Sequence, residues 1–132
     1  MNAPSVDVKD VLEGEAVGTF GTDLFISAEP ASPDSCVTLY DYNQVEAPMV
    51  NPDLYPFQTG FVQIRVRDPH FAAAWAKCAE VLDAIVRQPG KFTSSGVHYI
   101  DVQKINGPAF LLKDDANRTI VVANVRIFRQ QQ

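Results

Sequence analysis

The pattern that most limits the fold is a strand, a corner and one long helix over residues 60–86. In its first part apolar and polar residues alternate, which is the two-residue period of a half-buried strand. The apolar members of the alternation are Val62, Ile64 and Val66. Asp68 and Pro69 then predict a helix start, because Asp68 can accept a hydrogen bond from a first-turn amide and Pro69 needs no donor there.

The helix predicted from residue 71 carries apolar side chains at helical spacing. These residues are Phe71, Trp75, Cys78, Leu82, Ile85 and Val86. Alanines between them favour the helix and permit close packing. Gln-Pro-Gly at 88–90 ends it. We therefore expect this helix and the preceding strand to supply the core.

Length and charge narrow the class of protein. The 132 residues suit one domain over 1–132, large enough to bury a core without metal or disulfide bonds. The net charge is −5 with basic residues scattered, which argues against a specific nucleic-acid partner. Neither a signal peptide nor a membrane-spanning stretch is expected. Cys36 and Cys78 are expected to be buried free thiols of a soluble protein made in a reducing cytoplasm, in preference to a disulfide or a nucleophile.

The remaining elements extend one sheet. The predicted elements are a helix at 5–13 capped by Ser5, strands at 23–28, 36–42, 97–105, 109–113 and 119–129, and a frayed tail at 130–132. The strands at 23–28 and 36–42 are expected to form a hairpin and to continue as a meander. The predicted class is α+β, a single mixed, mostly antiparallel sheet with one long and one short helix packed on one face.

The stretch from residue 43 to 60 fits this compact fold least well. It contains three prolines and little periodicity, although many of its residues are apolar. A connection of this length inside a small domain is usually functional or disordered. We interpret 43–60 as an extended arm that contacts a neighbouring chain through Met49, Leu54, Tyr55 and Phe57. A flap folded over its own sheet is an equal alternative.

Catalytic chemistry is not indicated. His70 and His98 have no serine or cysteine partner at a recognisable spacing. Asp114 and Asp115 have the composition of a turn, so a metal or acid-base role is the lesser alternative. The sequence therefore predicts no catalytic residue, no metal and no cofactor.

A polar face with several arginines is more informative. Arg65 and Arg67 lie on the polar side of the 60–67 strand, and Arg126 lies on the same side as Asn124 in the last strand. If these strands share a sheet, one face is cationic on an acidic protein. A solvated face with routine ion pairs is one interpretation. An assembly surface that selects a carboxylate-rich partner is the other.

The order of several short motifs resembles the tail terminator proteins of tailed phages, often labelled minor capsid proteins. The resemblance is carried by GTFGTDLF at 18–25, Pro30, Pro33-Asp34, VTLY at 37–40, QIRVR at 63–67 before the alanine-rich helix, Pro108-Ala109-Phe110, Asp114-Asp115, Arg118 and Asn124-Val125-Arg126. These motifs cover nearly the whole chain in order.

The resemblance implies a structural virion protein and not an enzyme. Its subunits would close into a ring, usually a hexamer, that caps the tail tube at the head-proximal end of the tail. The ring would stop polymerisation and present a surface to the head-tail connector protein. The candidate contacts are Met49, Leu54, Tyr55, Phe57, Arg65, Arg67 and Arg126. Two alternatives stay open: a head-tail connector or neck protein, and a small-ligand-binding or hydrolytic α+β domain with His98 and Asp114 or Asp115 in its pocket.

Overall fold

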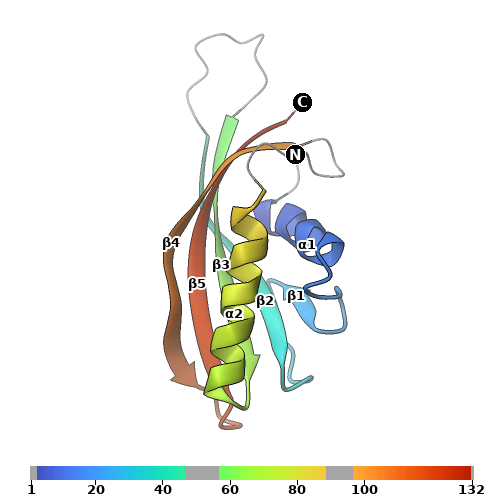
Figure 1. The fold of residues 1–132 in the computed structure, drawn as a ribbon, viewed down its shortest axis with the longest axis vertical. Helices are drawn as coiled ribbons and strands as arrows, with labels where there is room; N and C mark the ends of the chain where they lie inside the picture. Colours follow the sequence, from blue (N-terminus) through green and yellow to red (C-terminus); the bar gives the residue numbers. More distant parts are fainter. Residues whose placement is uncertain (1–2, 47–56, 89–96, 132) are drawn as a thin grey trace.

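The computed structural model describes residues 3–46, 57–88 and 97–131, and shows a curved sheet with both helices on the same face (Figure 1). The elements are α1 (Pro4–Gly14), β1 (Leu24–Ile26), β2 (Cys36–Glu46), β3 (Phe57–Asp68), α2 (Phe71–Val86), β4 (Val97–Lys113) and β5 (Thr119–Gln131). The strand order is β1-β2-β3-β5-β4, with β1 parallel to β2 and the other pairs antiparallel. The predicted α+β class is confirmed.

The core lies between the sheet and the two helices. The alternation predicted for β3 is confirmed, because its apolar side chains are buried on the helix side, together with alternate residues of β5. The buried residues of the two strands include Val62, Ile64, Val66, Val121, Ala123 and Val125. The helices contribute Val8 and Leu12 from α1 and Ala74, Cys78, Val81, Leu82 and Ile85 from α2. Both cysteines are buried and free, as predicted.

The buried stripe of α2 differs from the predicted one at the start of the helix. Phe71 and Trp75 are 49% and 40% exposed, whereas Ala74 and Cys78 are fully buried. The short side chain of Ala74 faces the core, so the two aromatic residues fall on the flank of the helix. Val86 is also exposed. Helical spacing alone did not determine which part of a broad apolar arc faces the sheet.

Both predicted helix caps are wrong by two residues. Ala3 precedes α1, and the Ser5 hydroxyl donates a hydrogen bond to Asp41 instead of capping the helix. His70 precedes α2, so Pro69 lies outside it. The Asp68 carboxylate does accept a hydrogen bond from a backbone amide, that of His70, at 2.8 Å. That contact stabilises the corner before the helix.

The predicted hairpin between the first two strands is wrong, since β1 runs parallel to β2 with Leu24 opposite Val37. The segment 27–35 carries the chain back to the start of β2. Long-range bonds fix this path: the guanidinium groups of Arg67 and Arg118 donate to carbonyl oxygens of the segment. Because side chains from distant strands hold this segment, the neighbouring residues in the sequence do not predict its path.

The two strands predicted between 97 and 113 are one continuous strand, β4, with several irregularities in its register against β5. Gly107 has φ of +97°, which lets the backbone bend without ending the ladder. The predicted arm of 43–60 is also shorter, because β2 continues to Glu46 and β3 begins at Phe57. No helix among the described residues has the length and apolar character needed to cross a membrane.

Candidate functional site

The predicted arginine-bearing surface lies on the sheet face that points away from both helices, which we call the open face. In the register of β3 and β5, Gln63 lies opposite Asn124 and Phe61 opposite Arg126. Arg65 is two residues from Gln63 and therefore on the same side. The two strands thus bring Arg65 and Arg126 to one face.

Arg65 and Arg126 have partners within their own chain. Arg65 Nη2 lies 3.1 Å from Glu29 Oε2, and both side chains are partly buried. The guanidinium of Arg126 donates a hydrogen bond to the side-chain oxygen of Gln103 on β4. Partly exposed pairs of this kind contribute little to stability. We still predict that Arg65 and Arg126 leave these intrachain partners and bind groups on a neighbouring chain.

Arg67 has a different environment. Its side chain is 3% exposed and donates hydrogen bonds to the backbone carbonyls of Pro33 at 2.6 Å and Asp34 at 3.4 Å. Arg118 holds the same segment, 27–35, by donating to the carbonyl of Ala31 at 2.7 Å. Arg67 therefore fixes the chain between β1 and β2, and its direct contact with another subunit remains a prediction.

The acidic pair at 114–115 belongs to a turn. The backbone N–H of Arg118 donates to Asp114 at 2.9 Å, and its guanidinium donates to the other carboxylate oxygen at 2.8 Å. These contacts, led by the backbone hydrogen bond, lower the pKa of Asp114. Asp114 thus stabilises the turn that connects β4 and β5.

Most of the predicted arm, including Met49, Leu54 and Tyr55, lies outside the described residues. Phe57 is the first residue of β3, and its backbone pairs with Gln130 of β5. The role of these four residues in assembly remains a prediction.

Sequence reasoning missed an aromatic patch beside α2, formed by Phe71, Trp75 and Phe110. The ring centroids of Phe71 and Trp75 are 5.7 Å apart, and those of Phe71 and Phe110 are 6.3 Å apart. Phe110 is 53% exposed, so all three rings keep large exposed areas. The sequence did contain a signal for this patch. A helix that covers one sheet needs a single apolar stripe, whereas the apolar residues of α2 extend beyond one stripe.

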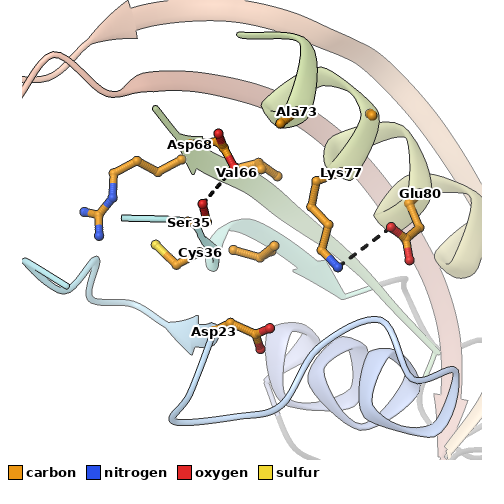
Figure 2. Close-up of a pocket in the computed structure, with 11 residues that line it drawn as sticks. Asp23, Ser35, Cys36, Val66, Asp68, Ala73, Lys77 and Glu80 are labelled. Atoms are coloured by element: carbon orange, nitrogen blue, oxygen red, sulfur yellow. Dashed lines mark hydrogen bonds and ion pairs between the residues drawn. The ribbon is translucent and has the colours of Figure 1, made fainter. Parts of the chain in front are cut away.

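A groove of about 480 Å³ lies on the opposite flank of α2, between that helix, the start of β2 and the end of β3 (Figure 2). We call it the α2 groove; its apolar residues include Val37, Val66, Ala73 and Ala76, and its charged residues include Asp23, Asp68, Lys77 and Glu80. The Lys77 ammonium donates to the carbonyl of Val17 at 2.5 Å and lies 3.8 Å from Glu80. Neither His98 nor Asp114 lines this groove, so it is not the ligand pocket that the alternative hypothesis requires.

A family model described as "Bacteriophage tail terminator protein" matches residues 11–130, nearly the whole chain. The chain belongs to the bacteriophage tail terminator family. Its fold is similar to that of a chain in the solved structure "Virion of native gene transfer agent (GTA) particle", with a TM-score of 0.69 and 18% identity, over 97% of this chain and 95% of that chain. That likeness concerns the fold. No curated protein matches the chain.

Membership in the tail terminator family confirms the resemblance predicted from the sequence and makes the protein a structural component of a virion, not an enzyme. The buried thiols agree with that role. Burial raises the pKa of Cys78 to about 11 and also raises the pKa of Cys36, so neither is an activated nucleophile. Within the described part of the chain, no three side chains of His, Cys, Asp or Glu gather into a metal site.

Proposed function

We propose that this tail terminator family protein closes into a ring, expected to be a hexamer, that caps the tail tube. The cap ends polymerisation of the tube and presents a surface to the head-tail connector protein. It would act at the head-proximal end of the tail, after assembly in the host cytoplasm. The family match over residues 11–130 carries the proposal.

Symmetry gives the proposal its physical basis. A tube end that repeats around an axis offers the same surface several times. A closed ring of identical chains can meet each repeat with the same contact, whereas a single chain can meet only one. Each weak contact then adds to the others, because the ring holds all of them at a high effective concentration.

Two sets of residues are proposed to contact other chains. The first is the predicted arm with Met49, Leu54 and Tyr55, together with Phe57 at the start of β3. The second is the open face with Arg65 and Arg126, where planar guanidinium groups suit carboxylates on the tube or connector protein. Arg67 supports this face by holding the 27–35 segment in place.

Tube assembly in vitro tests the function. Tail tube protein from the same phage is polymerised with increasing amounts of this protein, and tube lengths are measured by negative-stain electron microscopy. We expect shorter tubes, each with a ring at one end. Unchanged tube lengths, with no protein bound at the ends, would contradict the proposal. Binding to the connector protein without any effect on tubes would favour a connector role instead.

A double variant addresses the arm. Tyr55→Ser with Phe57→Ser should weaken ring formation and leave the melting temperature nearly unchanged, because an arm contributes to contacts between chains and not to the core. Tyr42→Ser is a matched control, since Tyr42 is a partly exposed aromatic residue of the same sheet. A loss of several kcal/mol in the unfolding free energy of the arm variant would assign the segment to the core.

A further inference from the structure

Two complementary surfaces flank the same turns of α2. At about 3.6 residues per turn, Phe71 and Trp75 share one side of the helix, whereas Ala73, Ala76 and Glu80 lie on the other. The first pair belongs to the aromatic patch, and the other three line the α2 groove. Phe110 places the patch on the β4 side of α2. Residues of β2 and β3 line the groove on the other side, and the ribbon shows β4 and β2 on opposite sides of α2 (Figure 1).

The aromatic patch is large enough to be the centre of an interface. A fully buried aromatic side chain removes about 150–250 Å² from water. About half of each ring system of Phe71, Trp75 and Phe110 is exposed, which leaves on the order of 200–400 Å². A standard interface uses about 800 Å² per partner. The three rings are therefore enough for the apolar centre of such an interface, which a polar rim completes.

Charge complements the two surfaces. Around the α2 groove, three carboxylates, those of Asp23, Asp68 and Glu80, outnumber the two cations, Lys77 and Arg67. The Arg67 guanidinium already donates to backbone carbonyls of the 27–35 segment. On the other side, Phe110 and Lys113 pair with Val121 and Thr119 of β5, which places both side chains on the helix side of β4. Lys113 is exposed and has no ion pair among the described residues. The patch is thus apolar with a cation beside it, and the groove is apolar with acids around it.

We propose that the aromatic patch of one copy seats on the α2 groove of the next copy, with Lys113 directed at the acidic rim that includes Glu80. This contact deepens the proposed ring and rests on that function. It is heterologous, because each copy offers its patch to one neighbour and its groove to the other.

The position of the surfaces favours a closed ring over a filament. Patch and groove share α2 between residues 71 and 80, so they lie at nearly the same level along that helix. When the α2 helices of neighbouring copies are parallel, a contact between surfaces at one level relates the copies by a rotation with little rise along α2. Repetition of such a rotation closes into a ring when its angle divides a full turn, whereas an added rise would produce a helix of subunits.

Two blocked variants test the pairing. The patch variant carries Phe71→Ser and Phe110→Ser, and the groove variant carries Ala73→Arg. Light scattering on a sizing column follows each protein alone and their equimolar mixture. We expect the wild-type chain to form rings and each variant alone to stay monomeric. The mixture should give a dimer of one copy of each, because only the patch of one and the groove of the other remain functional.

A patch-to-patch contact gives a different result. The groove variant, whose patch is intact, would then dimerise alone, and the mixture would contain no mixed dimer. That result would overturn the proposal. Tyr42→Ser and Ala116→Arg are matched controls, because they place the same new side chains at other exposed positions. Both should form wild-type rings, and circular dichroism checks that every variant is folded.

Trp75 supplies a direct measurement in the wild-type chain. It is the only tryptophan, so its emission reports on the patch alone. Dilution through the assembly range should move the emission to longer wavelength as Trp75 returns to water. Lys113→Glu should shift the midpoint of that transition to at least about tenfold higher concentration, and Lys113→Glu with Glu80→Lys should recover part of the loss.

The inference and the proposed function fail in different ways. Rings that form with unchanged Trp75 emission, or that persist in the patch variant, would overturn this contact and leave the ring function intact. A wild-type chain that stays monomeric at high concentration and never binds tail tubes would overturn both.

Discussion

An ion pair between Asp7 and Arg129 joins the first helix to the last strand. Asp7 lies in the first turn of α1, and Arg129 lies near the end of β5. Arg129 Nη1 is 2.5 Å from Asp7 Oδ2, and their side chains are 1% and 0% exposed. Because both charges are out of water, each depends strongly on the other.

The structure sets the size of the effect of Asp7→Asn. The substitution removes the carboxylate charge and leaves the guanidinium of Arg129 buried without it. Removal of one member of a buried pair costs about 3–5 kcal/mol. That is a large part of the roughly 5–15 kcal/mol that holds a domain folded. At 132 residues we expect the melting temperature to fall by roughly 10–20 °C.

Thermal and urea unfolding, followed by circular dichroism, measure this loss. Asp10→Asn is the matched control, because Asp10 lies one turn later in α1 and pairs with Lys9 at the surface, where the effect should stay below about 1 kcal/mol. The double variant Asp7→Leu with Arg129→Met should recover most of the stability, since it removes both buried charges. If Asp7→Asn lowers stability no more than Asp10→Asn, the buried-pair argument is refuted.

Three further predictions concern a bend, a turn and a thiol. Gly107→Ala should lower the unfolding free energy, measured in urea, by roughly 2–4 kcal/mol. The reason is that φ at this position is +97° and a Cβ would lie 2.6 Å from the carbonyl oxygen of Val122. An unchanged unfolding free energy would contradict the bend in β4. The pKa of Asp114 is lowered on folding, so its carboxylate stabilises the protein fully above the usual pKa of 3.8 and loses this effect as the pH falls through the folded-state pKa. Asp114→Asn should therefore be less stable than the wild type at pH 6, and the two proteins should have similar stability near pH 2. A difference in stability that does not change with pH would contradict this linkage. Cys78, with a pKa raised to about 11 by burial, should react with a thiol reagent at pH 8 much more slowly in the native than in the unfolded protein, and equal rates would contradict its burial.

Local patterns were sufficient for the central elements of the fold. The alternation in β3 and the apolar spacing of α2 predicted both elements because each depends on neighbours in the sequence. The direction of β1 was beyond such reasoning. It depends on the 27–35 segment, which is held by Arg67 and Arg118, residues that are distant in the chain. The predicted division of residues 97–113 into two strands was also wrong. Gly107 permits a bend in the backbone, and β4 stays paired with β5 on both sides of it.

The candidate surfaces were only partly accessible to sequence reasoning. Period-two alternation placed Arg65 and Arg126 on one polar side, and the strand register brings them together. It could not distinguish those two from Arg67, whose burial arises from a segment that folds over the sheet. Phe71 and Trp75 fit the core stripe of a helix, and only the packing of Ala74 against the sheet leaves them exposed.

An image of the tube end tests most directly whether this protein caps the tail tube as a ring. Tail tubes assembled with this protein would be examined by cryo-electron microscopy, with class averages collected separately for the two ends and for the side wall. We expect one closed ring of six subunits, each of 14.5 kDa, at one end of each tube and nowhere else. Single copies bound along the wall, or tube ends without added density, would contradict it.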